Sequence, residues 1–162
     1  MESIKQLYKI GLGPSSSHTM GPRKAAIEFL KMSEGAARRR VTLYGALAAT
    51  GKGHLTDKAI LDELEPDAPC EIVWLPEVFL PFHPNGVRFE ALDSTGAVIA
   101  DETFYSIGGG DIVKEGQSRI KASDVYDLST IKDILKWCED TGGSYWEYVD
   151  RCEDSDVWDY LR

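Results

Sequence analysis

The stretch Val41-Thr42-Leu43-Tyr44-Gly45-Ala46-Leu47-Ala48 carries no charge and is mostly apolar. Such a run predicts a buried strand, and its small residues indicate that another segment packs closely on its face. The loop Thr50-Gly51-Lys52-Gly53-His54 follows, and then a predicted helix over 56–64, in which Ile60 and Leu64 lie four apart. This part of the chain is therefore predicted to be a strand, a glycine-rich loop and a helix.

The flanking sequence adds one helix and three strands. Apolar residues at helical spacing predict a helix over 23–33, with Pro22 at its first position. The predicted strands span 70–75, 87–92 and 98–106, with a hairpin turn at Asp93-Ser94-Thr95-Gly96. The resulting order, α-β-α-β-β-β, predicts an α+β fold in which two helices pack on one face of a mixed sheet.

The last part of the chain is predicted to lie outside this fold. We expect a domain over residues 1–113, and a linker with a helical extension over 114–162, the polar linker being 114–123. The extension has two helix signals: a helical spacing of Ile131, Ile134, Leu135 and Cys138, and a capping box from Ser144 to Glu147. We expect the aromatic segment 146–158 to mediate self-association, and the chain to be a homodimer.

Composition and charge narrow the class of protein. A chain of 162 residues with 43% hydrophobic residues is one soluble domain, with at most an appendage. The sequence has no apolar run of about 18 residues and no apolar leader, so we expect a cytoplasmic protein without a membrane partner. Residues 1–60 carry ten Lys or Arg against four Asp or Glu, whereas residues 61–162 carry eight against twenty-three. The basic first part suits an anionic ligand.

Two further features exclude other classes. The basic cluster Arg38-Arg39-Arg40 lacks interleaved aromatic residues, so we expect no nucleic-acid partner, and we place it at the solvated end of a helix. Cys70, Cys138 and Cys152 are odd in number and widely spaced. They predict neither a disulfide framework nor a metal site in this chain.

The first candidate site is the loop Gly13-Pro14-Ser15-Ser16-Ser17-His18-Thr19. Its hydroxyls, together with free amides at the start of the helix at Pro22, would suit a small carboxylate. A serine-rich turn that only caps the helix remains the alternative.

The second candidate site is the loop that ends at His54. At the entrance of a helix, His54 is either a partner of the helix N-terminus or a general base, since histidine titrates closest to neutrality. Two later segments are also candidates: the turn His83-Pro84-Asn85-Gly86, and Tyr105-Ser106-Ile107-Gly108-Gly109-Gly110. Each is consistent with an ordinary turn or with the flexible end of a strand. Each is equally consistent with a place where a ligand or another chain approaches closely.

Taken together, these four segments closely resemble the iron–sulfur-dependent L-serine dehydratases of bacteria. The matching residues are 13–22, 44–54, 83–86 and 105–110, in family order, and the resemblance spans residues 3–115. It implies the β part of an enzyme that converts L-serine to pyruvate and ammonia. It also implies a fold like the allosteric substrate-binding domain of some phosphoglycerate dehydrogenases.

The resemblance further implies a [4Fe–4S] cluster, held by an α part that is not in this chain. An iron with an open coordination site acts on the serine hydroxyl as a Lewis acid, and a base removes the α-proton. We expect His54 to be that base. The expected substrate-binding residues are Ser15, Ser16, Ser17, His18, Thr19, Lys52, His83 and Asn85. This chain alone is expected to be inactive.

Three functional readings follow from the sequence. The chain is the substrate-binding part of a serine dehydratase, a regulatory serine-binding module without chemistry, or a dimerisation domain whose loops bind nothing. Binding of L-serine separates the third reading from the others, and turnover to pyruvate with a cluster-bearing partner separates the first two.

Overall fold

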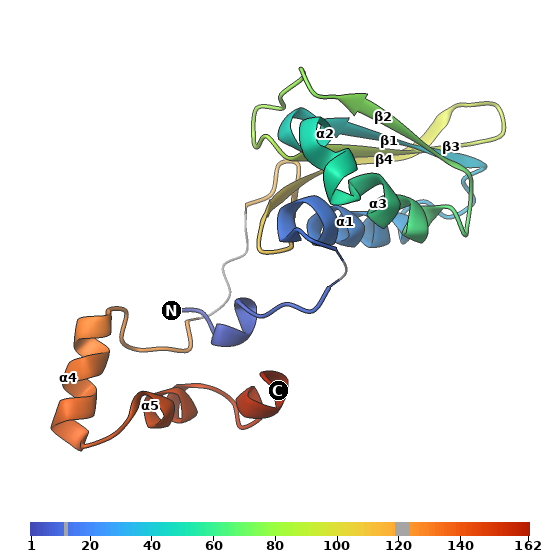
Figure 1. Cartoon of the computed structure of the whole chain (residues 1–162). Coiled ribbons are helices and arrows are strands. Elements are labelled where there is room, and N and C mark those ends of the chain that lie inside the picture. Colours follow the sequence, from blue (N-terminus) through green and yellow to red (C-terminus); the bar gives the residue numbers. More distant parts are fainter. Residues whose placement is uncertain (12, 119–123) are drawn as a thin grey trace. The chain divides into compact units, whose positions relative to one another are not determined.

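The computed structural model describes residues 1–11, 13–118 and 124–162, and it divides into two compact units (Figure 1). The larger unit is Gly11–Arg119, and the smaller combines Met1–Ile10 with Ile120–Arg162. The four candidate segments all belong to the larger unit.

The larger unit is built on one open sheet of five strands. The strands are β1 (Arg38–Tyr44), β2 (Cys70–Leu75), β3 (Gly86–Leu92), β4 (Val98–Gly108) and β5 (Asp111–Lys114). Their order across the sheet is β2-β1-β3-β4-β5. The pair β1–β2 is parallel and the other three pairs are antiparallel, so the sheet is mixed, as the sequence predicts.

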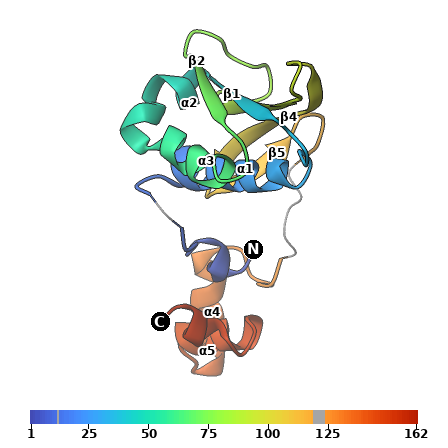
Figure 2. The ribbon, with the colours of Figure 1, turned by 90° about the vertical axis from the view of Figure 1, so that its right-hand side faces the viewer.

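Two helices, α1 (Gly21–Leu30) and α3 (Thr56–Leu64), lie side by side on one face of the sheet (Figures 1 and 2). Each turns a buried stripe toward the strands, because its apolar residues recur at helical spacing. In α1 the stripe ends at Phe29, whose ring stacks on Phe89 of β3 with centroids 5.3 Å apart. Phe89 in turn meets Phe104 of β4 edge-on at 5.7 Å. This aromatic series is the centre of the core, and the α+β prediction is confirmed.

The structure corrects three details of the predicted elements. The strand expected over 41–48 ends at Tyr44, and Gly45–Thr50 forms the short helix α2, followed by the 3-10 turn η3 (Gly51–His54). Gly45 has a positive φ of 49°, which lets the chain turn from strand into helix at that point. The triple glycine does not end the sheet, since β4 runs to Gly108 and turns back into β5.

The arginine cluster is the third correction, because it begins β1 instead of ending a helix. The side chain of Arg39 is 1% exposed. Its guanidinium donates to the carbonyls of Ser33 and Leu64 and to the carboxylate of Asp67. A buried arginine with these partners ties the ends of α1 and α3 to the first strand.

The smaller unit is helical. It contains η1 (Ile4–Gln6), α4 (Ile131–Thr141), α5 (Tyr145–Cys152) and α6 (Val157–Tyr160). The predicted capping box is present, with Ser144 and Glu147 bonded to each other's backbone amides. The rings of Trp146 and Trp158 meet at 5.7 Å, and self-association through this segment stays a prediction. Of the expected linker over 114–123, Lys114 ends β5, and 119–123 lie outside the described residues.

Candidate functional site

The four candidate segments meet at one end of the sheet. β1 ends at Tyr44, β3 begins at Gly86 and β4 ends at Gly108. In the register of the sheet, Leu43 faces Val87, and Gly86 faces Tyr105. Because β3 runs antiparallel to both neighbours, the end of β1, the start of β3 and the end of β4 share one edge. The first loop joins them from η2 (Ser16–Met20), which leads directly into α1.

Two reciprocal hydrogen bonds join the first and second loops. Thr19 Oγ1 donates to the His54 carbonyl at 2.8 Å, and Thr56 Oγ1 donates to the His18 carbonyl at 2.6 Å. Thr19 is 2% exposed and Thr56 is fully buried. Each loop therefore holds the backbone of the other at its histidine, and the two imidazole rings lie with centroids 4.8 Å apart.

The His54 ring has a defined tautomer in its neutral form. Its Nδ1 lies 3.0 Å from the Thr50 carbonyl, which only accepts hydrogen bonds, so Nδ1 is the donor. Nε2 then carries the lone pair, which is what a proton acceptor requires. His54 is half-buried. The second loop thus presents a positioned imidazole with an available base nitrogen.

The surroundings of His18 disfavour its protonation. Burial lowers its pKa, the Ala46 backbone opposes that shift, and the positive charge that His54 can take lowers it further. Its Nδ1 lies 2.9 Å from Ser17 Oγ, whose hydroxyl can donate to it or accept from it. Among the described residues, its buried Nε2 has no hydrogen-bond partner of ordinary geometry. A buried ring nitrogen in this state favours a polar guest.

The start of α1 does not offer the free amides that the sequence suggested. The Gly21 amide bonds to the Ser16 carbonyl, and the amides of Thr19 and Met20 bond to the Ser15 carbonyl. Ser15 also caps η2, because its Oγ accepts from the His18 amide at 3.2 Å. The amides of residues 18–21 are therefore already used, while the side-chain hydroxyls and the His18 ring of this loop can still donate to a carboxylate.

The third and fourth segments are joined to each other and to α2. Asn85 and Ser106 exchange two hydrogen bonds: the Ser106 amide to the Asn85 carbonyl at 3.0 Å, and Asn85 Nδ2 to the Ser106 carbonyl at 3.3 Å. The Ala46 amide donates to the Pro84 carbonyl at 3.0 Å. His83 Nδ1 accepts from the Asn85 amide, so its Nε2 bears the proton in the neutral ring.

The sequence indicates the fourth segment as a whole, but it does not single out Ser106 within that segment. Ser106 is 1% exposed, and its Oγ has no hydrogen-bond partner among the described residues. A Cβ built on Gly21 would lie 2.1 Å from that Oγ, so the serine sits directly against the start of α1. This hydroxyl links the fourth segment to the first, and only its burial in the fold reveals it. Thr56 was missed for the same reason, because its role depends on a carbonyl 38 positions away.

Two predicted site residues point elsewhere. Lys52 places its Nζ over the Trp74 ring of β2, 5.4 Å from the centroid, which is a cation–π contact. Ser16 is exposed, and its carbonyl rather than its hydroxyl carries its contact to Gly21. Ser15, Ser17, His18, Thr19 and His54 are therefore the residues brought together most closely, with His83 and Asn85 at the same sheet edge.

The described residues do not fit a metal cluster. Among residues 1–11, 13–118 and 124–162, no group of three or more His, Cys, Asp or Glu side chains is placed to hold a metal ion. Cys70 lies on β2, whereas Cys138 and Cys152 lie on α4 and α5 of the other unit. Burial raises the pKa of the Cys70 thiol to about 12, which disfavours the thiolate that ligates metals.

Comparisons with known proteins identify the family of the chain. The sequence matches the family described as "Serine dehydratase beta chain" over residues 3–74 and 63–117. The chain belongs to this family. The L-serine dehydratase of Streptomyces coelicolor is 34% identical, over 86% of this chain and 41% of that protein. The L-serine dehydratase of Mycobacterium tuberculosis is 38% identical, over 72% of this chain and 34% of that protein.

The same pattern holds for L-serine dehydratase 1 of Escherichia coli, which is 32% identical over 89% of this chain and 41% of that protein. The chain therefore spans about two fifths of the length of most of the relatives that it matches. The family match covers all four candidate segments of this serine dehydratase beta chain member. In the part of the chain that the structure describes, no helix has the length and apolarity to cross a bilayer.

Proposed function

We propose that this chain is the substrate-binding β part of an L-serine dehydratase, which deaminates L-serine to pyruvate and ammonia. The observation that supports it most directly is the pair of reciprocal bonds through Thr19 and Thr56, which fix His18 and His54 beside each other at 4.8 Å. Relatives named L-serine dehydratase, and the family match over both loops, support the same substrate.

Within this proposal the base is His54. Abstraction of the α-proton of serine needs a neutral imidazole with an exposed lone pair, and the Nδ1 bond to Thr50 leaves that lone pair on Nε2. The proton moves from the serine α-carbon to Nε2, and the electron pair left on carbon forms the double bond of the enamine as hydroxide departs. The enamine then tautomerises to an imine, and water hydrolyses it to pyruvate and ammonia.

The first loop holds the carboxylate of the substrate. Ser15 and Ser17 supply hydroxyl donors, and His18 supplies a buried Nε2 that a polar guest satisfies. Thr19 has a different role, because its hydroxyl hydrogen is already used on the His54 carbonyl. It is a positioning residue that holds the base.

Three further residues complete the pocket at its rim. The neutral His83 ring has its donor at Nε2, and Asn85 is fixed by Ser106. Lys52 adds a positive charge at the rim and reaches the ligand when it leaves Trp74. These roles place one cation and two polar side chains around the amino-acid guest.

The rest of the enzyme belongs to the same proposal. A [4Fe–4S] cluster, held by an α part, would supply a Lewis acid for the serine hydroxyl, and the described residues of this chain do not fit such a cluster. Residues 1–113 form the β domain, and residues 114–162 form a linker and an extension toward the α part. We also propose a cytoplasmic homodimer, and a likeness of the β domain to the allosteric substrate-binding domain of phosphoglycerate dehydrogenases.

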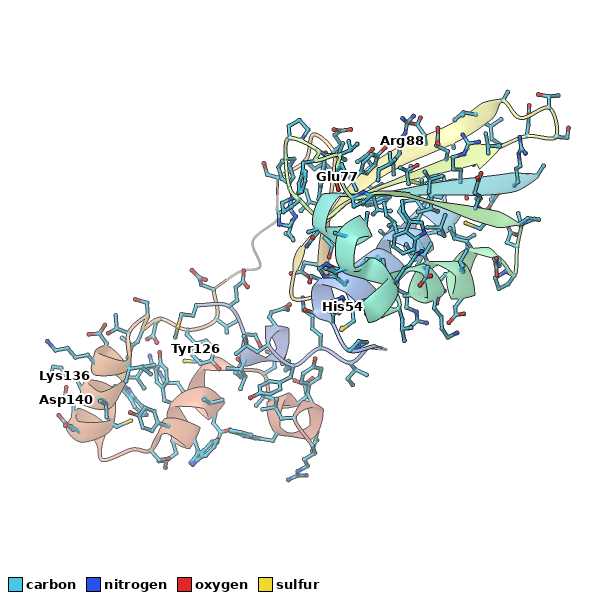
Figure 3. The ribbon with its side chains drawn as sticks, turned by 45° about the horizontal axis from the view of Figure 1, so that its top comes forward. His54, Glu77, Arg88, Tyr126, Lys136 and Asp140 are labelled. Atoms are coloured by element: carbon cyan, nitrogen blue, oxygen red, sulfur yellow. The ribbon has the colours of Figure 1, made fainter. Side chains whose placement is uncertain are left out.

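The proposal is tested first by binding. Calorimetric titration of the chain with L-serine is expected to show binding that His18→Asn weakens by about tenfold, because the buried ring nitrogen is lost. Arg88→Gln is the control and leaves the affinity unchanged, because the Arg88 side chain is paired with Asp101 and lies apart from His54 (Figure 3). A chain that binds no L-serine refutes the proposal and favours a dimerisation domain.

The catalytic role is tested with the cluster-bearing α part added. Pyruvate is expected only from the mixture, and measurable pyruvate from the chain alone overturns the predicted inactivity. His54→Gln is expected to bind L-serine with near-normal affinity and to lose turnover and exchange of the α-proton with deuterium from solvent. If His54→Gln keeps near-normal kcat, the base is another group. If wild type binds L-serine but the mixture never turns it over, the chain is a regulatory module.

A further inference from the structure

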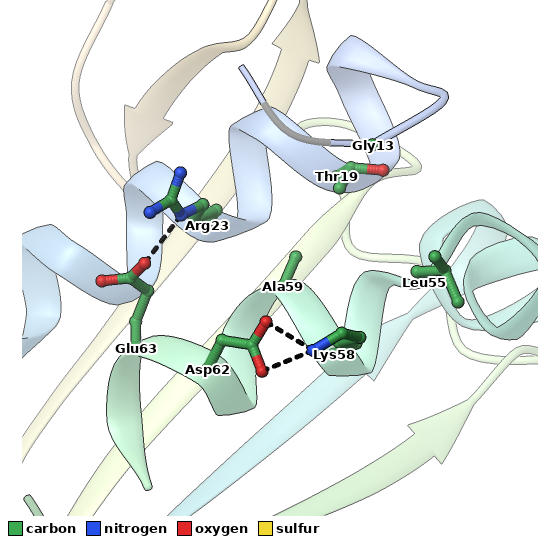
Figure 4. A pocket seen from close by; sticks show the side chains of 8 residues that line it. All are labelled: Gly13, Thr19, Arg23, Leu55, Lys58, Ala59, Asp62 and Glu63. Carbon is green, nitrogen blue, oxygen red and sulfur yellow. Dashed lines mark hydrogen bonds and ion pairs between the residues drawn. The ribbon is translucent and has the colours of Figure 1, made fainter. Parts of the chain in front are cut away.

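A cavity of about 280 Å³ lies beside the candidate site, between η2 and α1 on one side and α3 on the other (Figure 4). Its interior is mostly apolar, with contributions from Leu55, Ala59 and the side chain of Thr19. A water molecule takes up about 30 Å³ in the liquid, so the cavity has room for about nine water molecules. A guest of this size is a small metabolite and not a peptide.

The rim of this cavity carries charges of both signs. Arg23 Nε bonds to Glu63 at 2.7 Å, and Lys58 Nζ bonds to both Asp62 oxygens at 2.8 and 2.9 Å (Figure 4). The Arg23 bond uses only Nε, and its two terminal nitrogens have no partner among the described residues. Those two nitrogens form the fork that takes a carboxylate in bidentate fashion. Glu63 and Asp62 lie within the same rim and suit an ammonium group.

We propose that this cavity is a second small-molecule site, which takes an aliphatic α-amino acid of the size of leucine or isoleucine. The carboxylate of the guest binds Arg23, its ammonium group binds the acidic residues of the rim, and its hydrocarbon side chain fills the space over Leu55 and Ala59. Leucine, with nine non-hydrogen atoms, fits within this volume. Serine is smaller and polar, and leaves the apolar interior unfilled.

The cavity is connected to the histidine pair by two of its wall residues. Thr19 lines it and donates to the His54 carbonyl. Leu55, which follows His54 directly, is the described non-glycine residue with a left-handed backbone, at φ 59°. This conformation is strained for a branched side chain and persists only where its surroundings hold it. A guest packed against Leu55 therefore acts on the backbone that positions His54, and the site is regulatory.

Calorimetric titration of the full chain with L-leucine tests the proposal. We expect binding with a dissociation constant of about 1 mM or tighter, in line with a guest of nine atoms. Two truncated probes separate the charges: 4-methylpentanoate lacks the ammonium group, and 3-methylbutylamine lacks the carboxylate. Both are expected to bind at least about tenfold more weakly, and equal binding of either overturns the assignment of an amino acid.

Two variants test whether L-leucine binds inside the cavity. Ala59→Leu fills the interior and Arg23→Gln removes the fork, and each is expected to weaken L-leucine binding by about tenfold or more. Arg88→Gln is the matched control, since Arg88 is similarly exposed, is paired with Asp101 and lies in the same unit. Circular dichroism checks the fold of each variant. No binding of L-leucine up to about 20 mM overturns the proposal, as does an affinity that both Ala59→Leu and Arg23→Gln leave unchanged.

The binding part of this inference does not rest on the proposed function, whereas its regulatory part does. If L-leucine binds and L-serine does not, the proposed function fails and the cavity stands. If L-serine binds and L-leucine does not, the proposal for the cavity fails and the proposed function stands. Imidazole resonances of His54, assigned with His54→Gln, are expected to shift when L-leucine is added. Resonances that stay unmoved at saturation remove the regulatory role.

Discussion

Thr56 Oγ1 donates a 2.6 Å hydrogen bond to the backbone carbonyl of His18, 38 residues earlier in the chain. Its counterpart runs from Thr19 Oγ1 to the His54 carbonyl at 2.8 Å. The two bonds close a loop-to-loop connection in which each threonine lies next to, or near, the histidine that the other one holds. Both hydroxyls are buried, so their loss leaves carbonyl groups without a partner inside the protein.

The first prediction concerns these threonines. Thr56→Val keeps the shape of the side chain and removes its donor, so it is expected to lower the free energy of unfolding by about 1–3 kcal/mol. Thr19→Val is expected to cost a similar amount, and the double variant less than the sum, because both act on one connection. Urea unfolding measures all three. Thr50→Val, whose exposed hydroxyl bonds only to the carbonyl of Ala46, is expected to change little. Additive costs from Thr19 and Thr56 would show that the two bonds are independent.

The second prediction concerns the contact between Gly21 and Ser106. A methyl group at position 21 would meet Ser106 Oγ at 2.1 Å and Ser106 Cβ at 3.0 Å. Gly21→Ala is therefore expected to destabilise the chain by about 1–3 kcal/mol through overpacking. Ser106→Ala in the same chain is expected to restore part of the loss, because it removes the closer atom. Thermal unfolding of the two single variants and the double variant checks this. The pairing is wrong if Ser106→Ala brings no recovery.

The sequence predicts the elements of the fold better than its contacts. The helix over 56–64 and the strand over 70–75 have the predicted bounds, because spacing and proline positions define them locally. Residues 45–48 were predicted as strand but belong to α2, since a short apolar run of small residues is ambiguous between a strand and a buried helix. The turn from Gly108 into β5 was missed because glycines signal a break as readily as a hairpin.

In the candidate site, too, the sequence predicts the segments but not the contacts between them. Loops rich in serine, glycine and histidine are visible in the sequence, and the fold brings them to one sheet edge. The tautomer of His54 depends on the Thr50 carbonyl, and the role of Ser106 depends on burial against Gly21. Neither the carbonyl direction nor the burial of a single hydroxyl is encoded in local residue types. These contacts require the assembled sheet.

The third prediction concerns pH. Burial lowers the pKa of His18 in the folded chain, so the unfolded chain binds its proton more readily. Stability that depends on neutral His18 is therefore complete above the ordinary histidine pKa of about 6.5 and is lost as the pH falls below it. Urea unfolding of wild type and His18→Gln between pH 8 and pH 5 measures the effect. As the pH falls from 8 to 5, the free energy of unfolding of wild type is expected to fall by more than that of His18→Gln. A difference between the two proteins that does not change with pH contradicts the prediction.

The fourth prediction concerns Arg39, which lies buried in a sequence cluster that resembles a solvated one. Its guanidinium bonds to Ser33, Leu64 and Asp67 at once, which a shorter or apolar side chain cannot do. Arg39→Met is expected to cost about 3 kcal/mol, because it leaves two carbonyls and a serine hydroxyl without their donor. Arg39→Lys keeps the charge without the planar fork and is expected to fall between wild type and the methionine variant.

The neighbouring Arg38 supplies the matched control for this prediction. Arg38 is exposed at the start of β1, so Arg38→Met is expected to change stability by no more than about 0.5 kcal/mol. Urea unfolding of the Arg38 and Arg39 variants, with the same substitution one residue apart, isolates burial as the cause. If Arg39→Met costs no more than Arg38→Met, the guanidinium network does not hold the ends of α1 and α3 to the sheet. If Arg39→Lys matches wild type, charge alone is sufficient and the fork geometry has no effect.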